Sequence, residues 1–418
     1  MRRASAWLPT ALFASALLIA IVLVFRMTAP SSLLATPAYA RRFDTQCATC
    51  HSPMPPRLNN VGILFRRFGF RLPDSDESGK LVLKTLPAHG IGDAFAVAAD
   101  VGASEQPEAD PGTSRSSLQF GEVALLGGTS IDDHLSAQMV FLPRNGEGSS
   151  ELEDAELMAN GGAPGSQFSA RAGICEPFLW QKANHGSLTA SLPLVFDESP
   201  AAPVGDFGGL QLGQNQTEVE AGYTFTKLAK GHVLATLLSA ALLNGVTETG
   251  DAADRNPTDG ADVLVQGLEL IGSRNTLGGF YYHGRTVVDP LGELAPPGPF
   301  RERFDRYGAM GSFSPIDRLD ILGSVVGGND KSQQLDRTVN MLGEYVEVTG
   351  ELMPHWVLVY RWDEVDPDRD TGGDLVRADV ISSTYQLWDH LFLTAEWQQL
   401  RVADTKPHSI LADIRLIY

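Results

Sequence analysis

The chain contains little cysteine and, beyond its first 25 residues, no long apolar run. Among its 418 residues there are three cysteines, Cys47, Cys50 and Cys175, so a disulfide framework is excluded. After the start of the chain no segment approaches the length of apolar sequence that a membrane-spanning helix needs. This excludes a polytopic helical membrane protein. Any further membrane crossing would have to use β-strands, because only helices and closed barrels satisfy every backbone group in lipid.

Positive charge is also scarce, and it is unevenly placed. The whole chain has 32 basic and 51 acidic residues, a formal net charge of −19. Residues 41–90 nevertheless carry a net charge of +4, whereas residues 91–418 carry −26. So acidic a chain excludes nucleic acid as a partner. A small basic module joined to a strongly acidic body predicts that the two dock on each other.

Residues 1–40 have the features of an export signal. Arg2 and Arg3 precede an apolar stretch over residues 6–25, and Ala38-Tyr39-Ala40 offers a small-x-small cleavage site. The apolar stretch is almost long enough to span a membrane, so an uncleaved anchor is the alternative. Under either interpretation the remainder of the chain leaves the cytoplasm.

The segment 41–90 contains a motif with a specific chemistry, Cys47-Ala-Thr-Cys50-His51. Two thiols at this spacing can add to the two vinyl groups of one haem, and the adjacent histidine then lies under the iron. The motif predicts one covalently bound haem c, with Cys47 and Cys50 as tethers and His51 as the proximal ligand. Cys175 stands alone, and we expect a structural role for it.

An amphipathic helix follows the motif. Apolar residues recur at three- and four-residue spacing between Leu58 and Phe68, and Gly69 is expected to end the helix. Its apolar face can cover the haem plane. The candidates to pair with the haem propionates are arginines within and beside this helix, although a solvated face is the alternative for each. They are Arg57, Arg66, Arg67 and Arg71.

The sixth haem ligand is not apparent from the motif. Met54 lies too near His51 in sequence to reach the opposite face of the haem easily. His89, at the far end of the module, is the best-placed candidate. The choice matters because methionine ligation raises the potential relative to two histidines.

Residues 91–418 read as β-strands of about ten residues with one apolar and one polar face. In residues 355–362 the even positions are aromatic or aliphatic, and in residues 391–398 an apolar series opposes Thr394 and Glu396. Along the last strand, 410–418, the even positions are expected to face lipid, with Asp413 and Arg415 inward. A soluble sandwich or propeller is the alternative, but no repeat at blade spacing is present.

The connections between these strands alternate in length. Short turns are predicted near residues 131–133, 229–231, 273–275, 315–317, 351–353 and 389. Long loops are predicted near residues 103–115, 144–150, 177–216, 245–260, 288–301, 329–337, 364–374 and 402–407. Eight long loops imply about 16 strands. Even strand number, short turns at one end and long loops at the other are typical of transmembrane antiparallel β-barrels of the bacterial outer membrane.

Two long loops are rich in aspartate. Residues 251–262 contain four, and residues 363–374 resemble a calcium loop, but Thr371 stands where the EF-hand turn requires glycine. A solvated outer face is therefore favoured for both. A third loop, 177–216, carries Trp180, His185 and Phe196, and we hypothesise that it folds inward and narrows the lumen.

Taken with its motif, the chain resembles the fused monohaem cytochrome–porins of bacterial outer membranes, known as iron-oxidising cytochromes. The resemblance lies in the alanine-rich sequence before Arg41, the CATCH motif, Leu58-Asn59, Gly62, Phe65 and Gly69-Phe70. Phe70 replaces a family tyrosine, and Pro55-Pro56 inserts one residue. The close match covers about thirty residues, and the barrel matches only in length and pattern.

The resemblance implies a mainly β architecture in which a short α-helical c-type haem module, 41–90, plugs the outer-membrane barrel, 91–418. Electrons would pass from extracellular Fe(II), or another reductant, through the haem to a periplasmic cytochrome or copper protein. Two other functions stay open. One is a diffusion porin whose haem module gates or stabilises the channel, and the other is a haem enzyme such as a peroxidase.

Overall fold

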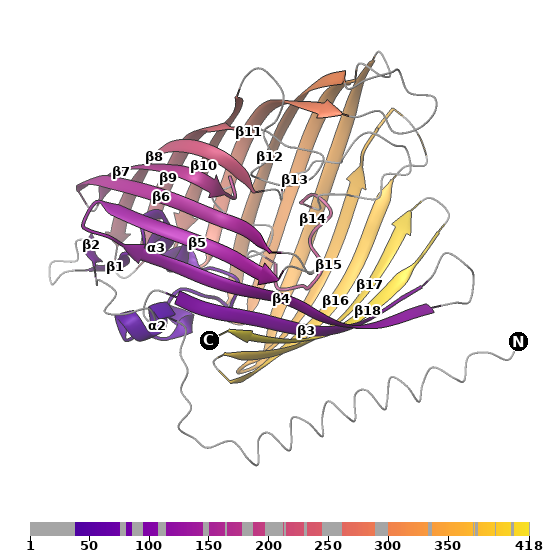
Figure 1. The fold of residues 1–418 in the computed structure, drawn as a ribbon, viewed down its shortest axis with the longest axis horizontal. Coiled ribbons are helices and arrows are strands. Elements are labelled where there is room, and N and C mark those ends of the chain that lie inside the picture. Colours follow the sequence, from indigo (N-terminus) through magenta and orange to yellow (C-terminus); the bar gives the residue numbers. More distant parts are fainter. Residues whose placement is uncertain are drawn as a thin grey trace, which may run out of the picture.

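Sixteen antiparallel strands form a closed barrel, with a small N-terminal segment at one end (Figure 1). The structure is a computed structural model. It describes residues 38–75, 81–85, 95–107, 114–144, 150–163, 165–177, 187–196, 212, 215–229, 232–244, 261–288, 300–332, 337–370, 372, 375–388, 390–402 and 405–417. None of the helices in these ranges is long and apolar enough to cross a membrane.

The barrel strands follow one another around the wall in chain order, and the last pairs with the first. They are β3 Phe95–Pro107, β4 Ser114–Ser130, β5 Leu135–Arg144, β6 Glu151–Ala163, β7 Ser166–Cys175, β8 Gln216–Ala229, β9 His232–Leu243, β10 Asp262–Ile271, β11 Asn275–Val288, β12 Phe300–Ile316, β13 Leu319–Ser332, β14 Arg337–Met353, β15 Trp356–Asp366, β16 Val376–Trp388, β17 Leu391–Val402 and β18 His408–Ile417.

The predicted strand number and the predicted alternation of connections are confirmed. Eight long connections join strands at one end, here called the long-loop end, and seven short turns join them at the other, the short-turn end. The short turn between β6 and β7, at residues 164–165, was not predicted. A closed sheet with every strand paired on both sides excludes a sandwich and a propeller.

The barrel wall has the two faces that a period of two residues dictates. On β15, Val357 and Val359 are buried in the lumen, whereas Leu358 and Tyr360 point outward and are 39% and 46% exposed. The same holds for the last strand, where Asp413 is buried. A belt of exposed aliphatic and aromatic side chains is typical of a barrel surface in contact with lipid.

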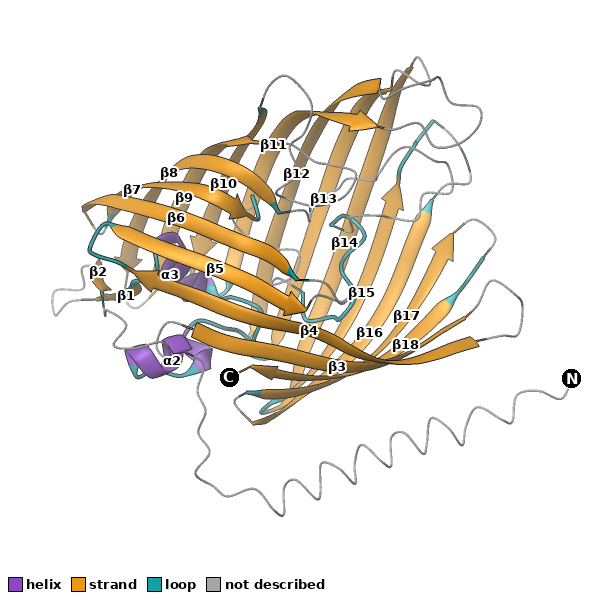
Figure 2. Ribbon diagram, in the orientation of Figure 1, coloured by secondary structure: helices purple, strands orange, loops and turns teal. Residues whose placement is uncertain are grey.

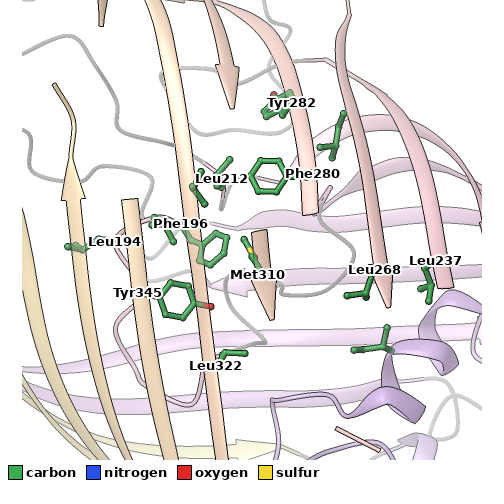
Figure 3. Packing of buried hydrophobic residues seen from close by; sticks show 14 of the residues in the cluster. Leu194, Phe196, Leu212, Leu237, Leu268, Phe280, Tyr282, Met310, Leu322 and Tyr345 are labelled. Atoms are coloured by element: carbon green, nitrogen blue, oxygen red, sulfur yellow. The ribbon is translucent and has the colours of Figure 1, made fainter. Parts of the chain in front are cut away.

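The lumen is apolar along much of the wall, which the alternation did not predict. Buried inward-facing side chains from β9 to β16 form one hydrophobic cluster with Leu64 of the N-terminal segment and Phe196 of a lumenal loop (Figure 3). Tyr345 of β14 packs edge-on against Phe196 with ring centroids 6.0 Å apart. Phe280 and Met310 lie close by in the same cluster (Figure 3). Burial of this apolar surface stabilises the filled lumen.

A stretch of the β7–β8 connection, residues 187–196, folds into the lumen and is here called the inward loop. This confirms the hypothesis for Phe196, whereas Trp180 and His185 lie outside the described residues. Arg361, fully buried on β15, donates to the carbonyl oxygens of Ser191 and Leu192 at 2.6 and 2.9 Å. Glu396 of β17 accepts from the backbone N–H groups of Ala190 and Ser191 at 2.6 and 2.9 Å. The wall thus holds the inward loop by hydrogen bonds to its backbone.

The N-terminal segment, residues 38–75, lies at the short-turn end of the lumen (Figure 2). It comprises helix α2 Ala38–Phe43, a 3-10 turn Cys47–Thr49, helix α3 Asn60–Arg67 and strand β1 Leu72–Ser75, which pairs with β2 Leu81–Lys84. The predicted helix is therefore present as α3. Glycine at position 69 adopts a φ of +65°, which ends the helix where the sequence indicates.

One buried carboxylate joins the N-terminal segment, the inward loop and the wall. Glu347, on the lumenal face of β14 and fully buried, forms an ion pair with Arg57. It also accepts from the Ser187 hydroxyl at 2.6 Å and from the Thr349 hydroxyl at 3.2 Å. A buried charge is stable only when it is paired and hydrogen-bonded, so each of these groups depends on the others.

Replacing this carboxylate tests that dependence. We expect Glu347→Gln to lower the free energy of unfolding by about 3–5 kcal/mol, because the buried Arg57 guanidinium loses the carboxylate that neutralises its charge. Equilibrium urea unfolding in detergent, followed by tryptophan fluorescence, measures the loss. Glu351→Gln, at the short-turn end of the same strand, is the control and should unfold like the unaltered protein. Equal stability of both variants would contradict the interpretation.

Candidate functional site

The CATCH sequence forms a tight turn beside helix α3. The backbone N–H groups of Cys50 and His51 donate to the Cys47 carbonyl oxygen at 3.1 and 3.0 Å. Both thiols are partly exposed, and they are not joined in a disulfide. Burial, and secondarily the nearby Cys47, raises the pKa of the Cys50 thiol to about 11. The turn therefore holds two free thiols, with a histidine directly after them.

His51 is held by a carbonyl group farther along the segment. Its Nδ1 lies 3.1 Å from the backbone oxygen of Arg57, and residues 51 and 58 form an isolated β-bridge. Because a carbonyl oxygen only accepts, Nδ1 carries the proton and the Nε2 lone pair is left for a metal. Burial lowers the pKa of His51, which favours the neutral imidazole that a metal requires.

Asn59 fastens helix α3 to this turn. Its side-chain oxygen accepts from the Gly62 backbone N–H at 3.0 Å and so caps the helix. Its amide nitrogen donates to the carbonyl oxygens of Ala48 and Thr49 at 3.3 and 3.1 Å, inside the CATCH sequence. Its backbone N–H donates to the Cys50 carbonyl oxygen at 2.9 Å. The Asn59 side chain thus hydrogen-bonds to backbone groups of both the CATCH turn and the first turn of the helix.

Gly62 allows the helix to lie against the turn. A Cβ atom at this position would lie 2.2 Å from the Cys50 carbonyl oxygen, so no other residue fits without movement of the backbone. The presence of Asn59 and Gly62 after the CATCH sequence therefore has a physical explanation. Together they fix the distance between the CATCH turn and the helix.

The arginines that the sequence assigns to haem propionates contact the barrel wall. Arg67 forms a buried ion pair with Glu220 of β8. Arg66 donates to Gln138 at 3.2 Å and lies 4.0 Å from Asp154. The remaining candidates are held as well, Arg57 by Glu347 and Arg71 by the carbonyl oxygens of Phe68 and Asp132. The propionate role of Arg57, Arg66, Arg67 and Arg71 stays a prediction.

The apolar face of α3, which the sequence assigns to covering a haem, packs against the lumenal wall and the inward loop through Ile63, Leu64 and Phe68. Met54 is buried among hydrocarbon side chains, which include Leu188 of the inward loop and Phe392 of β17. The other candidate for the sixth ligand, His89, lies outside the described residues.

An aromatic cluster joins α2 to α3. The rings of Tyr39 and Phe70 are stacked with centroids 5.4 Å apart, and both meet Phe65 edge-on at 5.1 and 5.8 Å. Phe43 contacts Phe65 at 5.5 Å. Helix α2 spans the expected cleavage site after Ala40, so cleavage there would remove Tyr39 from the cluster. The cleavage position stays a prediction.

Sequence reasoning did not identify the lumenal acids that receive the N-terminal segment. Glu220 and Glu347 stand at inward positions of their strands, and Gly222 gives room to the Arg67 guanidinium, which a Cβ atom would overlap. Arg171 adds a buried network with Glu218 and Glu220, at 2.7 and 3.2 Å. Acidic residues at alternate positions of a predicted strand, as at Glu218 and Glu220, are the pattern from which such inward-facing carboxylates could have been predicted.

Cys175 belongs to the same lumenal network. It is fully buried and donates to Glu218 at 3.1 Å.

The acidic loop near residue 368 does not form a calcium site among the described residues. Asp363 points into the lumen and pairs with Arg361 at 2.8 Å, while Asp368 pairs with Arg337. Within the described part of the chain, no group of three or more metal-ligating side chains could hold a metal ion. Residues 251–261 belong almost wholly to the part that is not described.

The barrel is similar to several solved porins. The anion-selective porin from Comamonas acidovorans aligns with a TM-score of 0.54 and 10% identity, over 78% of this chain and 98% of that chain. OprB of Pseudomonas putida, in a high-pH structure, gives 0.51 and 11% over 78% and 93%. Outer-membrane expressed OmpT of Vibrio cholerae gives 0.50 and 11% over 78% and 97%. No protein-family model and no curated protein matches the sequence. At these identities the likeness shows the fold alone: a porin-like barrel.

The close approach at Gly62 yields a test of the site's construction. We expect Gly62→Ala to separate α3 from the CATCH turn, because the added methyl group overlaps the Cys50 carbonyl oxygen. The measurement is limited proteolysis. If the substitution lowers the free energy of local opening by more than about 1.4 kcal/mol, cleavage between residues 47 and 62 should become at least about tenfold faster. Gly350→Ala on β14 is the control, since a Cβ atom there meets nothing within 4 Å. Unchanged protection in Gly62→Ala would show that the contact is dispensable.

Proposed function

We propose that this protein is an outer-membrane electron-transfer cytochrome of the fused monohaem cytochrome–porin type. One haem c is attached at Cys47 and Cys50 and ligated by His51. Electrons pass from an extracellular reductant, with Fe(II) as the candidate, to a periplasmic cytochrome or copper protein. The short-turn end, where the N-terminal segment lies, faces the periplasm, as short turns do in outer-membrane barrels.

The observation that carries this proposal is the hydrogen bond between His51 Nδ1 and the Arg57 carbonyl oxygen. Ligating histidines commonly donate their second ring N–H to a carbonyl or carboxylate, which fixes the tautomer and the ring orientation. Here the donor set fits a haem c: two thiols at the required spacing and a neutral imidazole with Nε2 as the ligating atom. When bound, the haem supplies a one-electron iron couple.

The chain's other residues set the position of that site. Asn59 and Gly62 hold the CATCH turn against α3, while Arg57 and Arg67 bind lumenal carboxylates. The net charges of +4 for residues 41–90 and −26 for the body favour the same docking. One haem cannot bridge an apolar band about 25 Å tall by itself, so the electron donor and acceptor must each approach it. They can do so reproducibly only if the barrel holds the haem in a fixed position. Oxidation of Fe(II) outside the cell also keeps insoluble ferric product out.

The second candidate is a diffusion porin in which the N-terminal segment gates or stabilises the channel. The comparisons themselves favour it, because the similar solved structures are porins, one of them anion-selective. Porin lumens that conduct solutes are polar and water-filled. In this barrel the inward faces of β9 to β16 are largely apolar and packed against α3 and the inward loop. That packing supports electron transfer over diffusion.

Haem attachment is the direct test. We expect Cys47→Ser and Cys50→Ser each to remove one thioether bond and the double variant to lose covalent haem, because no other thiol lies in the turn. Intact-protein mass spectrometry and haem staining of denaturing gels measure this. Cys175→Ser is the matched control and should keep the haem, since that residue belongs to the lumenal network instead. A haem-free wild-type protein purified from a host able to mature c-type cytochromes would refute the proposal.

Two further measurements separate the candidates. Fe(II) added to the oxidised protein should produce the reduced absorption spectrum of a c-type cytochrome. Liposomes containing the protein should swell far more slowly in small sugars than liposomes containing a diffusion porin, because α3, the inward loop and the wall pack into one apolar cluster inside the barrel. Swelling at a porin's rate, together with no reduction by Fe(II), would establish the second candidate in place of the first.

A further inference from the structure

Three cations stand side by side on the outward face near the long-loop end of the barrel. In the register of β11, β12 and β13, Arg285 lies opposite Arg303, and Arg303 lies opposite Lys331 (Figure 1 labels the strands). Arg303 and Lys331 are exposed and Arg285 is half-buried. Directly opposed side chains on one face lie about 5 Å apart at Cβ, so like charges there repel.

A second pair of opposed cations shows how this protein neutralises such a pair by itself. Arg377 of β16 lies opposite Arg401 of β17, also on the outward face. Each has a carboxylate partner: Glu364 at 2.5 Å from Arg377 and Asp379 at 2.7 Å from Arg401. The pairs Arg303–Lys331 and Arg377–Arg401 thus lie on the same face of the wall with the same register. In the second pair, carboxylates of neighbouring strands neutralise the arginines.

The pair Arg303–Lys331 has no such acid. In the described residues neither side chain forms an ion pair or a hydrogen bond with a carboxylate. Asp305, two residues from Arg303 on the outward face of β12, is engaged elsewhere: it accepts from the Tyr281 hydroxyl at 2.5 Å and lies 2.9 Å from His283 Nδ1. An anion from outside the chain would complete this arrangement.

Below the cations, along the same strands, lies an apolar surface. Tyr281 and Tyr307 are opposed on β11 and β12 and are 48% and 50% exposed, as aromatic residues at a membrane interface are. Beyond them a shallow groove of about 260 Å³ opens in the wall. The small residues Ala309, Gly311 and Gly323 hollow it, and its lining includes Leu277, Val325, Trp362 and the carboxylate residue Glu344.

The spacing between cations and groove matches a membrane lipid. Six residues separate Arg303 from Ala309 and Lys331 from Val325, or roughly 20 Å along a strand. With the strands of such barrels tilted by 35–45°, this corresponds to a depth of roughly 15 Å. That is about half of the hydrocarbon thickness of a bilayer, the depth of one leaflet.

We propose that β11–β13 form a binding site for a phosphate-bearing lipid of the outer leaflet. The phosphate lies on Arg303 and Lys331, beside Arg285, and an acyl chain crosses the tyrosine pair into the groove around Ala309. The lipid phosphate supplies Arg303 and Lys331 with a negative charge that they do not receive from a carboxylate among the described residues, and the groove supplies the tail contact that a free phosphate would not use. This site is independent of the haem and of the direction of electron flow.

The test uses the full protein in phosphatidylcholine nanodiscs that contain a small fraction of either phosphatidic acid or diacylglycerol. Native mass spectrometry of the ejected protein counts the retained lipid. We expect the unaltered protein to retain phosphatidic acid in preference to diacylglycerol. Each cation near a lipid surface contributes roughly a fivefold factor, so the double variant Arg303→Ala/Lys331→Ala should reduce retention of phosphatidic acid about 25-fold.

Matched variants separate head from tail. Arg377→Ala/Arg401→Ala removes two opposed outward cations that already have acids, and it should leave retention unchanged. Ala309→Leu fills the groove and should reduce retention of both lipids, whereas Ala240→Leu, outward on β9 and away from the groove, should not. No preference for phosphatidic acid, or equal losses in the two cation variants, would overturn the proposal. Haem content and Fe(II) reduction are measured on the same samples, so that failure of the electron-transfer proposal can be distinguished from failure of the lipid-site proposal.

Discussion

The packing of this molecule depends on how charge is buried inside the barrel. Glu347 receives groups from three parts of the chain: Arg57 from the N-terminal segment, Ser187 from the inward loop and Thr349 from its own strand. A buried carboxylate is stable only with such partners, and each partner is held in turn. The filled lumen is therefore a single assembly, in which the wall, loop and segment share one set of buried charges.

This arrangement differs from the lumen of a water-filled barrel. The inward faces of β9 to β16 are largely apolar, with charged groups only at particular positions such as Glu347 and Arg361. Arg361 donates to the backbone carbonyl oxygens of Ser191 and Leu192 and so fastens the inward loop to β15. The polar groups thus position the loop and the N-terminal segment, and the hydrophobic cluster excludes water around them. A barrel fold shared with porins here encloses a core.

The sequence predicted the barrel well because alternation and turn composition are local signals. The strand number follows from the turn composition, and the facing of residues 355–362 and of the last strand, predicted over 410–418, follows from a period of two residues. The apolar lumen was not predictable in this way. On β9 both faces are aliphatic, with Leu237 inward and Leu238 outward, so the pattern does not distinguish lumen from lipid. Between β6 and β7 the sequence has only Pro164-Gly165, too short a signal to separate two strands within one apolar pattern.

For the candidate site, the short-range part was predictable and the long-range part was not. CATCH, Asn59 and Gly62 lie within sixteen positions of one another, and each has a local physical cause. The partners of Arg57 and Arg67 lie 290 and 153 positions away, on strands whose arrangement only the closed barrel defines. Spacing along the chain contains no information about which lumenal acid meets which arginine.

The distance in sequence between Arg57 and Glu347 has a consequence for biogenesis. The amino-terminal residues leave the ribosome first, yet their lumenal contacts do not exist until β14 has joined the sheet, 290 positions later. The amino-terminal segment therefore gains its lumenal contacts late, when the strand that carries Glu347 has joined the sheet. Until then Arg57 and Glu347 both lack the ion pair that joins them in the folded protein.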